Sequence, residues 1–203
     1  VARFVDIHAL HTVPYANLNR DDLGTPKTVY YGGGVRTRVS SQCWKRAIRL
    51  AMEDELNDPA VRTRRVSLEV ADRLVRAGWP AELARFAGEQ VAAGAFEKGM
   101  SLEKGGLSSV LLFLPKSALD RLAALCEEHR DALTAAAEGA STGKGKKKDP
   151  SVLPRNVVNT VISERNGVIN LFGRMLAELP GANVDGAVQV AHAFTTHVAE
   201  PEV

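Results

Sequence analysis

The stretch RTRVSSQCWKRAIRLAM (residues 36–52) changes from the pattern of a strand to the pattern of a helix. Polar and β-branched residues alternate over Arg36–Val39, which predicts a short strand. Ser40 or Ser41 can accept a hydrogen bond from the first turn of a following helix and so act as its N-cap. The apolar positions of that helix recur at steps of three and four: Trp44, Ile48, Ala51 and Met52. The chain is therefore expected to pass directly from a strand into an amphipathic helix.

Outward from this stretch, strand patterns lie near both ends of the chain. Residues 3–13 (RFVDIHALHTV) alternate and contain β-branched residues, so we expect a strand there. Residues 184–198 alternate in the same way and are also expected to form a strand. Residues 14–36 are rich in Pro, Asn, Asp and Gly, which is typical of a loop.

The middle of the chain is mostly helical in pattern. Apolar residues recur at helical steps in four segments, which we expect to be helices: 66–77, 81–93, 117–137 (ended by Gly139) and 157–164. The apolar run VLLFL (110–114) fits either a buried strand or the core of a helix, because periodicity alone does not separate them. Strands at both ends with helices between them predict an α+β fold that holds a large helical insertion.

The composition is that of a soluble globular chain. Its 203 residues are 45% hydrophobic and 25% charged, and a formal net charge of +2 excludes a histone-like polycation. Cys43 and Cys126 match no zinc-finger or redox spacing. No apolar run approaches the ~18 residues of a membrane helix and no signal-peptide pattern is present, so we expect a cytoplasmic protein without a membrane partner. Because the chain starts at Val1 without a methionine and stops at Val203 inside an apolar stretch, we expect a fragment.

Several patterns that could indicate catalysis or cofactor binding are better explained structurally. GASTGKG (139–145) lacks the spacing of a phosphate-binding P-loop and is typical of a flexible basic linker. The histidine pairs near the two ends of the chain, His8 with His11 and His192 with His197, have odd spacing, which puts the members of each pair on opposite faces of a strand. We therefore expect packed or hydrogen-bonded histidines rather than metal ligands. Asp21 and Asp22 could hold a divalent cation, but paired aspartates in a Gly- and Pro-rich loop are usually turn formers. We therefore expect no metal, cofactor or catalytic residue.

The strongest charge signal lies between residues 20 and 49. This block has a formal charge of +5, from seven basic and two acidic residues: Arg20, Lys27, Arg36, Arg38, Lys45, Arg46 and Arg49 against Asp21 and Asp22. Ser40, Ser41 and Gln42 offer hydrogen bonds at the N-terminus of a helix, where the helix dipole favours an anion. Lys45 and Arg49 lie four residues apart and share one helical face.

Cations in the first turn of a helix are unfavourable for the helix alone, and an anionic ligand such as a phosphate would remove this conflict. Three interpretations of the block remain open. It is a nucleic-acid site, a solvated surface paired with acids such as Glu53 and Glu55, or part of an enzyme that acts on phosphorylated substrates.

Several longer motifs resemble one protein family. NLNRDD (17–22), followed by PKT, a glycine cluster, RTRVSSQ and WKRAIR, resembles the opening of the repeated backbone subunit of the type I-E CRISPR surveillance complex, Cascade. NGVINLFGRMLAE (166–178) and VDGAVQVAHAFTTH (184–197) resemble the second block of that family. The order and spacing of these motifs make the resemblance specific.

The resemblance implies an RRM-like (ferredoxin-like) palm with helical fingers and a protruding thumb. On that basis residues 1–58 begin the palm and carry the RNA-binding loop and helix. Residues 59–153 form the helical insertion and end in a basic flexible linker, and residues 154–203 continue the palm. The family extends beyond the AHAFTTH stretch into its thumb and closing strands, which we expect to be missing from this chain.

The resemblance also implies a non-catalytic role in antiviral defence. Several copies of the subunit would coat one CRISPR RNA head to tail and, with the other Cascade subunits, present it for pairing with target DNA. By matching position, the expected RNA-binding residues are Arg20, Lys27, Arg38, Ser40, Gln42, Lys45, Arg46, Arg49, Arg174 and Met175. Family members point lysines at target DNA roughly where this chain has Lys144, Lys146, Lys147 and Lys148. The alternative from another functional class is a metal-dependent endoribonuclease that processes CRISPR RNA.

Overall fold

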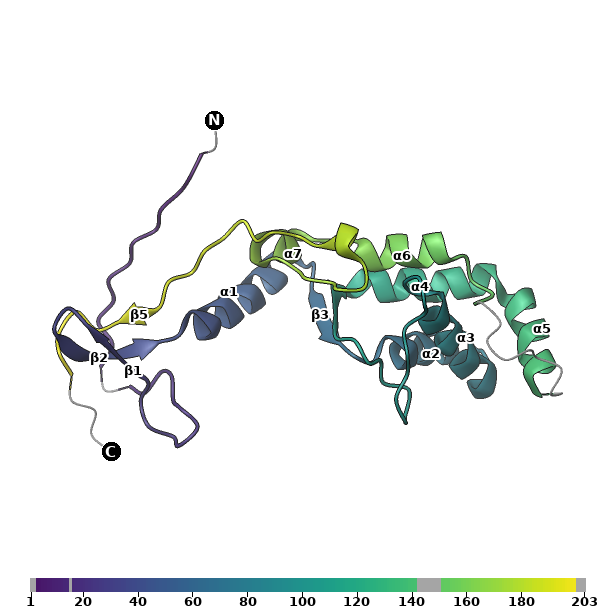
Figure 1. Cartoon of the computed structure of the whole chain (residues 1–203), viewed down its shortest axis with the longest axis horizontal. Coiled ribbons are helices and arrows are strands. Elements are labelled where there is room, and N and C mark those ends of the chain that lie inside the picture. The colour runs from purple at the N-terminus through teal and green to yellow at the C-terminus, as the bar shows by residue number, and fades with distance from the viewer. Residues whose placement is uncertain (1–2, 15, 142–150, 200–203) are drawn as a thin grey trace. The chain divides into compact units, whose positions relative to one another are not determined.

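A computed structural model describes residues 3–14, 16–141 and 151–199 of the chain (Figure 1). The chain divides into two compact units, of which unit 1 comprises Val1–Ala47 and Val190–Val203 and unit 2 comprises Ile48–Gln189. Strands and helices mixed along the chain confirm the α+β class, whereas the RRM-like palm and its division at residues 58 and 153 stay predictions. Within the described ranges, no helix has the length and apolar character needed to cross a membrane.

Unit 1 contains a three-stranded antiparallel sheet (Figure 1). Its strand order is β1 (Thr28–Tyr31), β2 (Gly34–Val39) and β5 (Ala193–Phe194). Gly32 and Gly33 join β1 to β2 with φ angles of 62° and 81°. A two-residue hairpin turn with positive φ at both positions favours glycine, which adopts that conformation without strain. The glycine cluster is therefore a hairpin turn.

The loop expected at residues 14–36 is wrong in its second half, because β1 lies within it. The strand TVYY consists of β-branched and aromatic residues, which suit a pleated sheet. These residues are surrounded by Pro and Gly, and only the pairing of Thr28 with Thr37 through Tyr31 with Gly34 makes them a strand.

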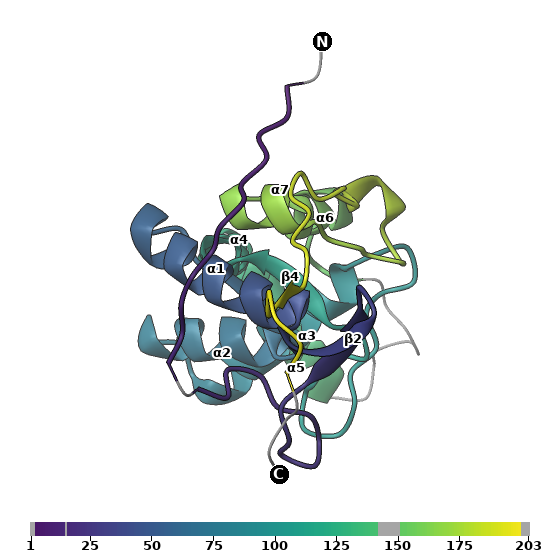
Figure 2. The ribbon, with the colours of Figure 1, turned by 90° about the vertical axis from the view of Figure 1, so that its left-hand side faces the viewer.

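The strand expected at residues 3–13 is absent from the structure. This segment runs as an extended trace without secondary structure (Figures 1 and 2). Its large apolar side chains are almost fully exposed, with Phe4, Ile7 and Leu10 at 86–89%. Alternation produces a strand only where another strand supplies hydrogen-bond partners, and no described residue pairs with this segment.

The strand expected at residues 184–198 is reduced to the two residues of β5. Its first part makes other contacts, because the amides of Ala187 and Val188 donate to the carbonyls of Asn170 and Leu171. The alternating pattern of residues 184–198 therefore does not correspond to one strand. The first part of this segment hydrogen-bonds to residues of α7 (Gly167–Phe172), and the second part pairs with β2.

The helix α1 (Ser41–Leu56) follows β2 directly, which confirms the transition read from the sequence. Ser40 is its N-cap, since the amide of Cys43 donates to Ser40 Oγ at 3.4 Å. The boundary between the two units falls within α1, between Ala47 and Ile48.

Unit 2 combines a two-stranded antiparallel sheet with a set of helices. The strands are β3 (Ala60–Thr63) and β4 (Leu112–Pro115), paired from Ala60 with Pro115 to Thr63 with Leu112. The helices are α2 (Val66–Arg76), α3 (Ala81–Gly94), α4 (Lys116–Glu128), α5 (Arg130–Ser141), α6 (Arg155–Ser163), α7 (Gly167–Phe172) and a 3-10 turn at Pro180–Ala182.

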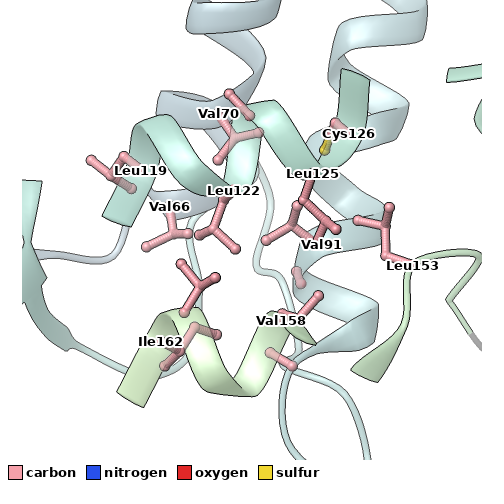
Figure 3. Close-up of a cluster of buried hydrophobic side chains, with 14 of the residues drawn as sticks. Val66, Val70, Val91, Leu119, Leu122, Leu125, Cys126, Leu153, Val158 and Ile162 are labelled. Carbon is pink, nitrogen blue, oxygen red and sulfur yellow. The ribbon is translucent and has the colours of Figure 1, made fainter. Parts of the chain in front are cut away.

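The buried core of unit 2 gathers around α4 (Figure 3). Side chains from α2, α3, α4 and α6 meet there, and they are fully or almost fully buried: Val66, Val70, Val91, Leu119, Leu122, Leu125, Val158 and Ile162. Burying a Leu- or Val-sized side chain contributes roughly 1.5–3 kcal/mol relative to exposure. This core explains why the helical periodicity of the sequence predicted α2, α3 and α6 correctly.

Two expectations about unit 2 change in the structure. The last three residues of the run VLLFL enter β4 because β3, which the sequence did not reveal, pairs with them. The single helix expected at 117–137 is two helices, broken at His129 and continuing beyond Gly139 to Ser141. The break redirects the chain while Leu133 of α5 stays buried in the same core.

Candidate nucleic-acid interface

The loop before β1 is closed by its own hydrogen bonds. The amide of Lys27 donates to the carbonyl of Asn19 at 2.9 Å, and Arg20 pairs with Pro26 as an isolated bridge. Inside the loop, Asp21 accepts hydrogen bonds from the amides of Leu23 and Thr25 at 2.9 Å and from the Thr25 hydroxyl at 2.5 Å.

The Thr25 hydroxyl, followed by backbone amides, lowers the pKa of Asp21, so this carboxylate is ionised and committed to the turn. The prediction that Asp21 is a turn former is confirmed.

The same loop is attached to the start of α1. The amide of Ser40 donates to Asn19 Oδ1 at 2.9 Å, and the amide of Arg38 donates to the carbonyl of Lys27 at 2.8 Å. These bonds attach the loop segment that carries Arg20 and Lys27 to the end of β2 and to Ser40, which precedes the positive end of the α1 dipole.

His192, from the segment that leads into β5, completes this region. Its Nδ1 accepts a hydrogen bond from the amide of Ser41 at 3.0 Å and lies 3.2 Å from Arg38 Nη1. The reading of His192 as a hydrogen-bonded histidine is thus confirmed. Its partners were not predictable, because Ser41 is 151 positions away and no local pattern links the two. In the described part of the chain, no three His, Cys, Asp or Glu side chains gather as a metal site.

Most basic residues of the block between residues 20 and 49 lack an acidic partner among the described residues. Six of the seven form no ion pair with any of them: Arg20, Lys27, Arg36, Arg38, Lys45 and Arg46. The first turn of α1 contains no acidic residue either. Arg20 and Arg46 are exposed, and the other four are partly exposed. For these six residues, the interpretation as a surface neutralised by neighbouring acids is not supported.

Arg49 differs from these six. In unit 2, its Nη1 lies 2.6 Å from Glu53 Oε1, one helical turn further along α1. The alternative of a cation paired with Glu53 is therefore observed at this one position of the basic block.

Arg174 and Met175 occupy opposite environments within unit 2. Arg174 is 6% exposed, and its guanidinium donates only to backbone carbonyls. Burial, followed by the nearby charge of Arg165, lowers the pKa of Arg174. Met175, the next residue, is 82% exposed. Only the second of the two is presented to solvent.

The lysines expected to meet target DNA, namely Lys144, Lys146, Lys147 and Lys148, lie outside the described residues, as does most of GASTGKG. The contacts by which Asn19 and His192 hold the loop and the start of α1 were not predicted from the sequence.

The chain is similar to known CRISPR-associated proteins. The family model of CT1975-like proteins (Cas_CT1975) matches residues 5–203. One solved chain, from a CRISPR RNA-guided surveillance complex, is 51% identical with a TM-score of 0.81, over 92% of this chain and 56% of that chain. Another, from such a complex in a pre-nicking state, is also 51% identical with a TM-score of 0.81, over 91% of this chain and 50% of that one.

The chain thus spans about half the length of these solved chains. None of the curated proteins matches it.

Proposed function

We propose that this chain, which belongs to the family of CT1975-like proteins, is a backbone subunit of the CRISPR RNA-guided surveillance complex Cascade and binds guide RNA through the basic surface of unit 1. The observation that carries the proposal is the set of six cations, Arg20 to Arg46, without an acidic partner among the described residues. An RNA backbone supplies the negative charge that this surface lacks.

The chemistry of the surface suits a sugar-phosphate backbone. Gln42 is exposed, so its side-chain amide adds a hydrogen-bond donor beside Lys45 and Arg46, and the helix dipole adds partial positive charge at the start of α1. Such contacts position a nucleic acid without reading its bases, as a subunit that accepts any guide sequence must do. Target selection is then left to pairing between guide and target.

The remaining predicted RNA contacts take different parts in the proposal. Arg49 is paired with Glu53 on the same helix. To contact RNA, its guanidinium would leave this carboxylate and bind a phosphate instead. Met175 would pack against a nucleotide, and Arg174 would hold the loop that presents it rather than touch RNA.

We further propose that several copies assemble head to tail along one guide and expose it to target DNA. Head-to-tail contacts do not close on themselves, so the RNA would set the length of the filament. The assignment of residues 59–153 as fingers, 1–58 and 154–203 as palm, and Lys144–Lys148 as a DNA contact belongs to the same proposal.

The role is proposed to be non-catalytic, and RNA incubated with magnesium is expected to stay intact. Asp21, one of the two aspartates that the nuclease alternative would use, accepts hydrogen bonds within the loop through both carboxylate oxygens. Magnesium-dependent cleavage that is lost in Asp22→Ala would favour the endoribonuclease alternative.

A salt titration of RNA binding tests the proposed site. For single strands the log–log slope falls by ~0.7 per lost phosphate contact, so Lys45→Ala with Arg46→Ala should reduce its magnitude by about 1.4. The measurement uses the full chain and an oligouridylate followed by fluorescence anisotropy, with thermal melting to check folding.

The matched control is Arg76→Ala with Arg85→Ala, which removes two exposed cations of unit 2 from α2 and α3. The control should leave the slope unchanged. Equal slopes for wild type and the Lys45/Arg46 variant would place the RNA contact elsewhere.

A further inference from the structure

One face of the unit 1 sheet combines arginines with an aromatic pair. The strand register pairs Tyr31 with Gly34 and Arg38 with Phe194. Cross-strand partners share a face, and so do alternate residues of one strand. Tyr31, Arg36, Arg38 and Phe194 therefore lie on the same side of the sheet. The ring centroids of Tyr31 and Phe194 are 4.9 Å apart, with 48° between the ring planes.

Both rings remain open to solvent. Tyr31 is 58% exposed and Phe194 is 42% exposed, so neither is part of a closed core. Large apolar side chains that touch one another and stay exposed often mark an interaction surface. Tyr30 is 74% exposed but lies on the opposite face of β1.

Arg36 fixes the two segments that carry the rings. Its Nε donates to the carbonyl of Tyr31 at 2.9 Å, and its Nη1 donates to the carbonyl of Thr195 at 2.8 Å. One guanidinium thus ties the end of β1 to the residue that follows Phe194. The charge of Arg36 is not neutralised by any described acid, so the rings lie beside a free positive charge.

We propose that Tyr31 and Phe194 form a stacking platform for an unpaired base of the bound RNA, with Arg36 and Arg38 attracting the adjacent phosphates. This inference rests on the proposed function and adds a base contact to the phosphate contacts argued above for unit 1. Proteins that bind single strands without sequence preference pair a cationic groove with aromatic rings, because every base offers a π-face. The two arginines and the absence of acids among the described residues of this face favour a polyanion over an apolar protein partner.

The test compares two ligands of equal length, an oligouridylate and the same oligomer with abasic ribose at every position. Wild-type chain should bind the oligouridylate about tenfold more tightly, the range expected for stacking of a base on a ring. Tyr31→Leu keeps an apolar side chain but removes one ring of the pair, so the preference for the oligouridylate should fall several-fold. The salt dependence of this variant should match that of wild type, because no phosphate contact is lost.

Two variants serve as controls. Tyr30→Leu removes an exposed ring from the same strand on the opposite face, and it should keep the preference for the oligouridylate. Tyr31→Phe keeps the aromatic ring and should also keep the preference for the oligouridylate. Circular dichroism and thermal melting of each variant establish that the sheet is folded.

A several-fold loss of the preference in Tyr31→Leu alone supports the platform. Three results would overturn the platform while leaving the phosphate site intact. The wild-type chain could bind both oligomers with equal affinity, or Tyr30→Leu could reduce the preference as much as Tyr31→Leu does. The third is a Tyr31→Leu variant that binds both oligomers more weakly by the same factor. If neither oligomer binds wild-type chain, the proposed function itself fails.

Discussion

Arg174 donates hydrogen bonds to carbonyls from three separate parts of unit 2. They belong to Ile162, Ser163 and Glu164 at the end of α6, to Phe113 of β4, and to Ala182. Its neighbour Met175 contacts solvent instead. Two consecutive residues of one motif therefore have different roles. Arg174 holds the loop by hydrogen bonds, and Met175 is exposed on that loop.

Arg174→Ala should lower the free energy of unfolding by roughly 3 kcal/mol, because it removes several hydrogen bonds from a charged donor and leaves buried carbonyls without it. Met175→Ala should change that free energy by no more than about 0.5 kcal/mol, since exposed positions tolerate substitution. Urea unfolding of both variants measures the difference. Equal effects would contradict the structural role of Arg174.

At the scale of the element, the contact between α2 and α3 depends on a residue without a side chain. A Cβ built on Gly88 would lie 2.2 Å from the carbonyl oxygen of Ser67, which is backbone of α2. The small residues Ala84 and Ala87 lie on the same buried side of α3. The two helices therefore pack at a distance that only glycine at position 88 allows.

Gly88→Ala should destabilise the protein by about 1–3 kcal/mol, because the clash with backbone outweighs the better helix propensity of alanine. Gly139→Ala in α5 is the matched control, since an added Cβ there would meet nothing within 4 Å. It should stabilise the protein by up to about 1 kcal/mol. Urea unfolding measures the free energy of unfolding of both variants. If both substitutions changed it in the same direction, close packing of α2 against α3 would not be what requires glycine at position 88.

At the scale of the whole molecule, the buried hydrophobic residues of the described chain all fall between Ala60 and Ala182, within unit 2. Unit 1 has its sheet, its closed loop and the capped start of α1, but Ser40 and Gly34 are its only buried residues in the described ranges. Apolar burial is the main source of folding stability. The two units are therefore expected to differ in local stability.

Amide hydrogen exchange measures this difference. Amides of α2 and α4 should exchange far more slowly than those of the β1–β2 hairpin, because opening free energies follow local burial. Addition of an oligouridylate should slow exchange in the hairpin and at the start of α1. A hairpin that exchanges as slowly as α4 without RNA would contradict this expectation.

The sequence alone determined those features that depend on residues close together in the chain. The turn at Asp21, the helical faces of α2, α3 and α6, and an N-cap at Ser40 or Ser41 were all predicted, because caps, turns and helical periodicity are short-range properties. The family could also be inferred from the sequence, since its motifs are contiguous.

Only the tertiary structure decided the features that need a distant partner. Residues 3–13 have the alternation of a strand but pair with no residue of the described ranges, whereas Leu112–Pro115 forms a strand because β3 lies beside it. The contact of Tyr31 with Phe194 and the burial of Arg174 likewise join residues that no local pattern connects. The sequence determines which hydrogen-bonding groups and apolar surfaces each residue has. Which groups they contact depends on the segments that folding brings next to them.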